Sequence, residues 1–111
     1  MAPRDREILR RIIDCSDAVD VRTARVGESW ADDDMAVDAI AKRVEEIGEI
    51  AKRLTLDALE LMPGVDWRGV KGICDVMAHN YLDIEVGVIA DVVVDYLPGL
   101  RAEISRALSD L

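Results

Sequence analysis

Apolar residues recur along the chain every three or four positions, the spacing that places side chains on one face of an α-helix. In the first such segment, residues 5–26, these positions are Ile8, Ile12, Cys15 and Val19. In the second and longest run they are Val37, Ile40, Val44, Ile47, Ala51 and Leu54. Gly27, which follows the first segment, suits a helix C-terminus. The pattern predicts two long amphipathic helices, each with one buried face.

The third quarter of the chain predicts two further helices. Thr55 is a good N-cap for a short helix over residues 56–61, which Pro63 and Gly64 would end. Asp66 is placed to cap a helix that runs to Tyr81. The apolar face of this helix is formed by Val70, Ile73 and Met77.

A last helical region is predicted after Asp83, and its apolar positions are Ile84, Val88, Val92, Tyr96, Leu100, Ile104 and Leu108. Pro98 lacks a backbone N–H and is expected to kink or restart the helix. Residues 92–94 would also suit a strand, but an isolated strand cannot form a sheet. Because every linker is short, we expect an all-α, antiparallel up-and-down bundle of four to five main helices, formed by residues 1–111 as one domain.

Composition narrows the class of protein. Half of the 111 residues are hydrophobic and a third are charged, as in folded proteins, and Phe is absent, so the core must be aliphatic. No apolar run suits a signal peptide or a membrane helix, and a cytoplasmic protein is expected. One histidine and two isolated cysteines cannot build a structural zinc site, and no metal or cofactor is expected.

The formal net charge is −9, from 14 Lys and Arg against 23 Asp and Glu. A nucleic-acid binder normally shows a basic surface, so any RNA contact must be local or be supplied by a second copy or a partner. Two local clusters have simple interpretations. The basic one, Arg4, Arg6, Arg10 and Arg11, is interpreted as a solvated helix face. The acidic one, Asp32–Asp34, suits the first turn of the second helix, whereas a divalent-ion site is disfavoured because consecutive residues point in different directions.

The segment from Gly72 to Glu85 carries the only histidine, His79. Imidazole is the side chain whose unperturbed pKa lies closest to neutrality. Asp75 lies one helical turn before His79, where it could orient the ring, and Tyr81 follows two residues later. A lone histidine is ordinarily a hydrogen-bonded structural residue, so this spacing alone does not establish a catalytic role.

Gly72, Asp75, His79 and Tyr81 nevertheless match the pattern Gly-x-Arg-Asn/Asp-x-x-x-His-x-Tyr of HepT-like proteins, a minimal HEPN-domain family. The arginine of that pattern falls on Cys74. An earlier segment also resembles this family, whose second helix typically reads Ile-Gly-Glu-Ala-x-Lys. The matching residues are Ile47, Gly48, Glu49 and Lys52, and Ala51 lies one position after the alanine of the pattern.

The resemblance implies metal-independent cleavage of RNA in a groove between two protomers. His79 would transfer the proton, because its pKa suits that task at neutral pH. The family arginine would offset charge on the phosphate, which the thiol of Cys74 cannot do. Lys71, two turns before His79, could supply part of that charge. A Cys74–His79 nucleophilic pair is disfavoured because the two residues lie roughly 140° apart on a helix.

The resemblance also implies partners. HepT-type toxins are neutralised by an MntA-like nucleotidyltransferase antitoxin that adds AMP to the tyrosine of the pattern, here Tyr81. We therefore expect a homodimer that meets RNA and this antitoxin, and no DNA or membrane partner. The alternative is a HEPN module that has lost catalysis with its arginine, at Cys74, and binds a nucleotidyltransferase or a nucleotide.

Overall fold

The computed structural model describes residues 1–79 and 86–109, apart from the side chains of residues 74 and 76–79. The regular structure of the described residues is helical. Its elements are α1 (Pro3–Val26), η1 (Trp30–Asp32), α2 (Asp34–Ala51), α3 (Leu56–Glu60), α4 (Trp67–His79), α5 (Val86–Asp91), η2 (Val92–Tyr96) and α6 (Leu97–Ser109). No described helix is long and apolar enough to cross a membrane.

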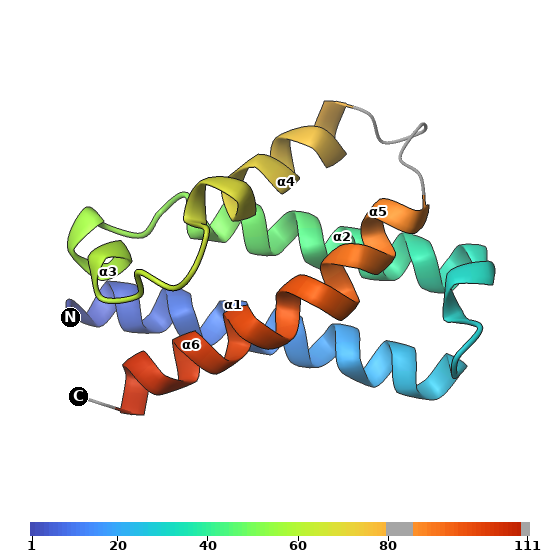
Figure 1. The fold of residues 1–111 in the computed structure, drawn as a ribbon, viewed down its shortest axis with the longest axis horizontal. Helices are drawn as coiled ribbons and strands as arrows, with labels where there is room; N and C mark the ends of the chain where they lie inside the picture. Colours follow the sequence, from blue (N-terminus) through green and yellow to red (C-terminus); the bar gives the residue numbers. More distant parts are fainter. Residues whose placement is uncertain (80–85, 110–111) are drawn as a thin grey trace.

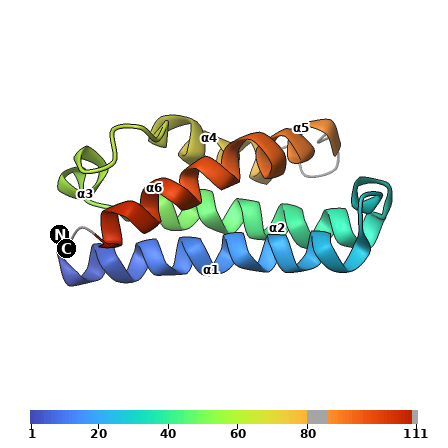
Figure 2. The same cartoon turned by 60° about the horizontal axis from the view of Figure 1, so that its bottom comes forward.

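The helices run up and down in the order of the chain (Figure 1). Helices α1 and α2 form an antiparallel pair, α4 returns along α2, and α5 leads through η2 into α6, which packs on α1. Figure 2 shows the α1–α2 pair as one layer, with α3, α4, α5 and α6 over it. The prediction of an all-α antiparallel bundle is confirmed, with α3 as a short additional helix.

Side-chain caps begin the helices where the sequence predicts them. The Thr55 hydroxyl accepts the backbone N–H of Ala58 at 3.3 Å and begins α3. Asp66 accepts the backbone N–H of Gly69 at 3.0 Å and begins α4. Among the three predicted acidic residues, Asp33 is the N-cap of α2. Such caps satisfy backbone donors that the helix itself leaves without partners.

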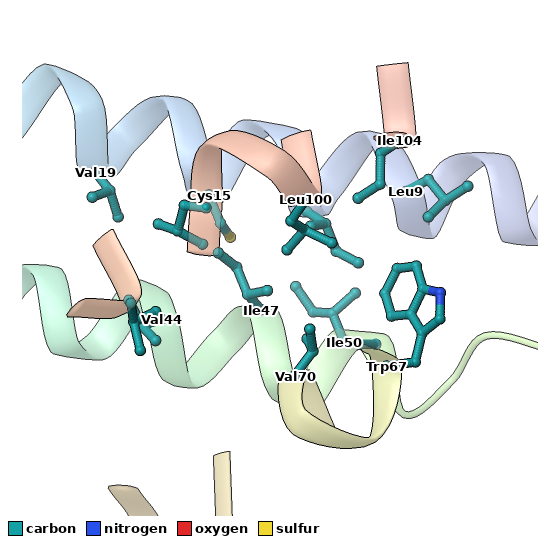
Figure 3. Packing of buried hydrophobic residues seen from close by; sticks show 14 of the residues in the cluster. Leu9, Cys15, Val19, Val44, Ile47, Ile50, Trp67, Val70, Leu100 and Ile104 are labelled. Carbon is teal, nitrogen blue, oxygen red and sulfur yellow. The ribbon is translucent and has the colours of Figure 1, made fainter. Parts of the chain in front are cut away.

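The core lies between the two layers; it is mostly aliphatic, but Trp30 and Trp67 are also buried in it, so the expectation of a purely aliphatic core is wrong. The predicted apolar positions of α1 and α2 are buried, including Ile12, Val19, Ile40 and Val44, except for Val37, which is partly buried. Figure 3 shows side chains of α1 and α2 meeting Leu100 and Ile104 of α6 and Val70 of α4. The buried hydrophobic cluster therefore fixes α4 and α6 on the α1–α2 pair.

Pro98 does not interrupt the C-terminal helix. The π-helical turn η2 precedes it and leads directly into α6. Proline cannot donate to the carbonyl four residues back, and its ring would clash with that carbonyl in a regular α-helix. The wider turn accommodates both constraints, so the expected kink or restart is replaced by a π-helical turn.

Candidate functional site

An ion pair joins α2 to α4. Lys52, at the C-cap of α2, places its Nζ 2.8 Å from Oδ1 of Asp75. Glu49 lies one turn before Lys52, with an Oε2–Nζ distance of 3.7 Å. The contact between Lys52 and Asp75 brings together the two segments in which the sequence resembles HepT-like proteins, although these residues are 23 positions apart.

The Lys52–Asp75 pair is too exposed to contribute much to stability. The two side chains expose 37% and 61% of their surface. Pairs of this kind typically contribute about 0–1 kcal/mol, because water screens them and their side chains lose freedom. The consequence of the contact is local: a carboxylate is held at a defined place on α4, beside a cation.

His79 is the last residue of α4 and lies one helical turn beyond Asp75. The helix places the two backbones one turn apart, and the pairing of their side chains stays a prediction. The side chains of His79 and Cys74 lie outside the described part of the chain, and so does Tyr81 as a whole. Their predicted roles remain predictions.

Lys71 lies on α4 one turn before Asp75 and is partly buried. Within the described residues it forms no ion pair and no side-chain hydrogen bond. Of the two lysines near Asp75, Lys52 forms an ion pair with the carboxylate, whereas Lys71 does not in the part of the chain that the structure describes; the predicted role of Lys71, positive charge for the phosphate, stays a prediction. Sequence reasoning gave Lys52 no role, although it lies within the first segment that resembles the family.

Gly48 and Gly72 differ in their surroundings. Gly48 is buried on α2. A Cβ atom built on Gly72 would meet none of the described atoms within 4 Å. The described part of this chain therefore makes no close approach at Gly72.

The start of α4 is fixed by hydrogen bonds around Asp66. Its Oδ1 accepts the backbone N–H of Gly69, and its Oδ2 accepts the hydroxyl of Tyr96 at 3.0 Å. The bond from Gly69, with smaller contributions from Tyr96 and Arg68, lowers the pKa of the Asp66 carboxyl. The same carboxylate raises the pKa of the Tyr96 phenol, which stays a neutral donor. This contact positions α4 against η2.

The described residues include no group of three or more His, Cys, Asp or Glu side chains placed to hold a metal ion. What the site does offer is an interhelical pair of opposite charges, with a second lysine one turn from it and the single histidine one turn beyond it.

Comparisons with known proteins show which family the chain resembles. A family model described as ribonuclease HepT-like matches residues 7–107. The chain is 27% identical over 95 residues to a Methanocaldococcus jannaschii protein named a putative RNase, a match that covers 86% of this chain and 78% of that protein. It is also 28% identical over 68 residues to a Thermococcus cleftensis protein named a probable ribonuclease HepT. This match covers 61% of this chain and 62% of that protein.

A second M. jannaschii protein, named a gamma-glutamylcyclotransferase and putative RNase, is 28% identical over 74 residues. This match covers 67% of the chain but only 33% of that protein. The chain thus spans less than two thirds of the length of two of the three relatives. No solved structure matches the chain significantly. Because the family model spans most of its length, the chain belongs to the ribonuclease HepT-like family.

Proposed function

We propose that this chain is a metal-independent endoribonuclease in which His79 transfers the proton and Asp75 orients the imidazole ring of His79. Family membership supports an RNase-type function. The observation that carries the finer proposal is the 2.8 Å contact between Lys52 and Asp75. It supports a defined position for the carboxylate one turn before His79, at the end of α4.

The proposed reaction needs a base for the 2′-hydroxyl of RNA, an acid for the leaving oxygen, and positive charge at the phosphate. Imidazole can serve as acid and base near neutral pH. In this proposal Lys52 holds Asp75, and Lys71 offers its charge to the phosphate. An ammonium does this less well than the bidentate guanidinium that the family has in place of Cys74.

Two copies of the chain would complete the site. The resemblance places the active groove between protomers, and a net charge of −9 leaves one chain short of basic groups for an RNA site. Exposed valines on α5 and η2 support self-association, since apolar side chains at a surface favour burial against a partner. They are Val86, Val88 and Val94. A homodimer is the expected assembly, and a monomer in light scattering at micromolar concentration would contradict it.

The same resemblance supports regulation by a nucleotidyltransferase antitoxin that attaches AMP to Tyr81. Phosphate groups at this position would place negative charge where the RNA phosphate must bind. Incubation with such an enzyme and ATP should raise the intact mass by AMP units in the wild type but not in Tyr81→Phe. Equal addition to both proteins would show that Tyr81 is not the acceptor.

A second candidate function is a binding module without catalysis, and Cys74 is the observation that favours it. Its thiol carries no positive charge and cannot hold a phosphate as arginine does. Such a module would bind a nucleotidyltransferase or a nucleotide through the same fold.

Cleavage of RNA by the purified chain distinguishes the two candidates. We expect slow cleavage that survives EDTA and is lost in His79→Ala, by about a hundred- to ten-thousandfold if the imidazole is the general acid–base group. Thermal unfolding of both proteins provides the control that His79→Ala folds. Equal cleavage by wild type and His79→Ala would reject the catalytic role, and a wild type that binds RNA without cutting it would favour the binding module.

A further inference from the structure

A groove on the α1–α2 pair is separate from the proposed site. Figure 1 and Figure 2 show α1 and α2 side by side along most of their length. The groove is a hollow of about 300 Å³. Part of its lining is apolar and includes the small Ala18 of α1 and Ala39 of α2 and the buried Val19 and Ile40.

Three cations and one carboxylate surround this hollow. Arg22 comes from α1, and Lys42, Arg43 and Glu46 come from α2. The surplus of two positive charges contrasts with the net charge of −9 for the chain. The three cationic side chains are exposed. A positive site in an acidic protein attracts anions locally without making the whole surface basic.

Glu46, the single carboxylate of the groove, already accepts hydrogen bonds within the protein. Glu46 Oε2 accepts from Arg43 Nη1 at 3.3 Å and from the thiol of Cys15 at 3.5 Å. Burial, followed by the neighbouring Glu46, raises the pKa of this thiol, so it stays a neutral donor. Arg22 and Lys42 form no ion pair or side-chain hydrogen bond with any residue that the structure describes. Their charges are therefore available to a ligand.

We propose that this groove binds the phosphate backbone of an RNA strand. The proposal rests on the proposed ribonuclease function for the identity of its ligand. Helix α2 carries both Lys42 in the groove and Lys52 in the proposed site, ten residues and thus roughly 15 Å apart along the helix axis. One strand could contact both, so the groove would add affinity for RNA beyond the nucleotides that are cleaved.

Binding of a short, fluorescently labelled 2′-O-methyl RNA, read by fluorescence anisotropy, tests the proposal. This RNA cannot be cut through its 2′-hydroxyl, so the readout does not depend on catalysis. The variant is the triple change Arg22→Gln, Lys42→Gln and Arg43→Gln. The matched control removes three arginines from the other end of α1, namely Arg4→Gln, Arg10→Gln and Arg11→Gln.

We expect the groove variant to bind the RNA about tenfold more weakly. The slope of log Kd against log salt concentration should also become smaller by about 2. The control should change Kd by less than about twofold at moderate salt, where charges distant from the ligand are screened. Glu46→Gln should bind about twofold more tightly, a gain that a folding defect cannot produce.

Equal loss in the groove variant and its control would show that net charge alone acts, and would overturn the proposal. Unchanged binding in the groove variant, or no RNA binding by the wild type, would overturn it as well. Displacement of the RNA by an equal concentration of AMP would assign the groove to a mononucleotide instead. His79→Ala should bind this RNA like the wild type. Failure of the catalytic proposal would therefore be visible separately: cleavage would not depend on His79, while RNA binding in the groove would remain.

Discussion

The two ends of α4 are held by different kinds of contact. At its start, Trp67 and Val70 are buried, and the indole N–H of Trp67 donates to the carbonyl of Met62 at 3.3 Å. Towards its end, the described interhelical polar contact is the exposed pair of Lys52 and Asp75. Burial at the start supplies stability, whereas an exposed pair adds little of it. Trp67 and Val70 near the start are thus constrained by folding, whereas the Lys52–Asp75 pair contributes little to it.

The largest effect that would sharpen this contrast is a gain of activity. Cys74→Arg restores the guanidinium of the family pattern, which should stabilise the transition state by about 3 kcal/mol and raise cleavage about a hundredfold. Initial rates on one RNA substrate measure this, and the variant should also be the hardest to express without an antitoxin. If the wild type already cleaves as fast as Cys74→Arg, another cation, such as Arg68 or an arginine from a partner copy, supplies the charge of the family arginine.

At the start of α4, Val70→Ala should act on stability alone. Val70 exposes 2% of its surface and lies beside Ile50 of α2 (Figure 3). The lost methyl groups and the cavity should cost about 2 kcal/mol, or a Tm roughly 10 °C lower for a chain of this length. Thermal unfolding and cleavage well below the new Tm should be compared. A matching loss of activity at that temperature would mean that the two ends of α4 are coupled.

Near the end of α4, Lys52→Ala should act on activity alone. We expect about tenfold slower cleavage, equivalent to about 1.4 kcal/mol, with a change in unfolding free energy below about 0.5 kcal/mol. The pH optimum should move upwards, because a carboxylate that loses its lysine favours a protonated imidazole more strongly.

The double variant of Lys52 and Asp75 serves as the control for this pair. If Lys52 acts through Asp75, adding Lys52→Ala to Asp75→Ala should slow cleavage no further. Additive losses would instead assign Lys52 an independent role. Lys71→Ala should lower activity separately, since Lys71 contacts neither residue of the pair in the described structure.

The smallest effect concerns Tyr96 and depends on pH. Tyr96→Phe removes the hydrogen bond to Asp66 and should lower Tm by roughly 1 to 3 °C near neutral pH. The pKa of Asp66 is lowered in the fold, so its contribution exists above the unfolded value of about 3.9 and is lost as the pH falls below it. The pKa of Tyr96 is raised, so its contribution exists below about 10 and is lost as the pH rises further. The Tm difference should therefore shrink at both extremes, and a constant difference from pH 3 to 11 would contradict this account.

Sequence periodicity predicted the bundle because each long helix has one apolar face, and local signals predicted the caps at Thr55 and Asp66. Contacts between distant segments could not be predicted in this way. Asp5 is buried and accepts from the hydroxyl and the backbone N–H of Thr55, at 2.7 and 3.1 Å, fifty residues away. Lys52 and Asp75 likewise meet only because α4 packs on α2. The partner of a charged residue can be identified only once the positions of the helices are known.

The π-helical turn η2 fixes the number of residues between α5 and α6. A π-helical turn holds one residue more than an α-helical one, so deletion of a single residue within Val92–Tyr96 would restore regular α-helix. The deletion would leave α5 and α6 close to their present register, because a π-helical turn accommodates its extra residue within one turn. Leu100 and Ile104 would stay turned towards the core, but Pro98 would lie in a regular α-helix, where its ring clashes with the carbonyl four residues back. A one-residue deletion in this segment should therefore be harder to tolerate than a substitution at any exposed position within it.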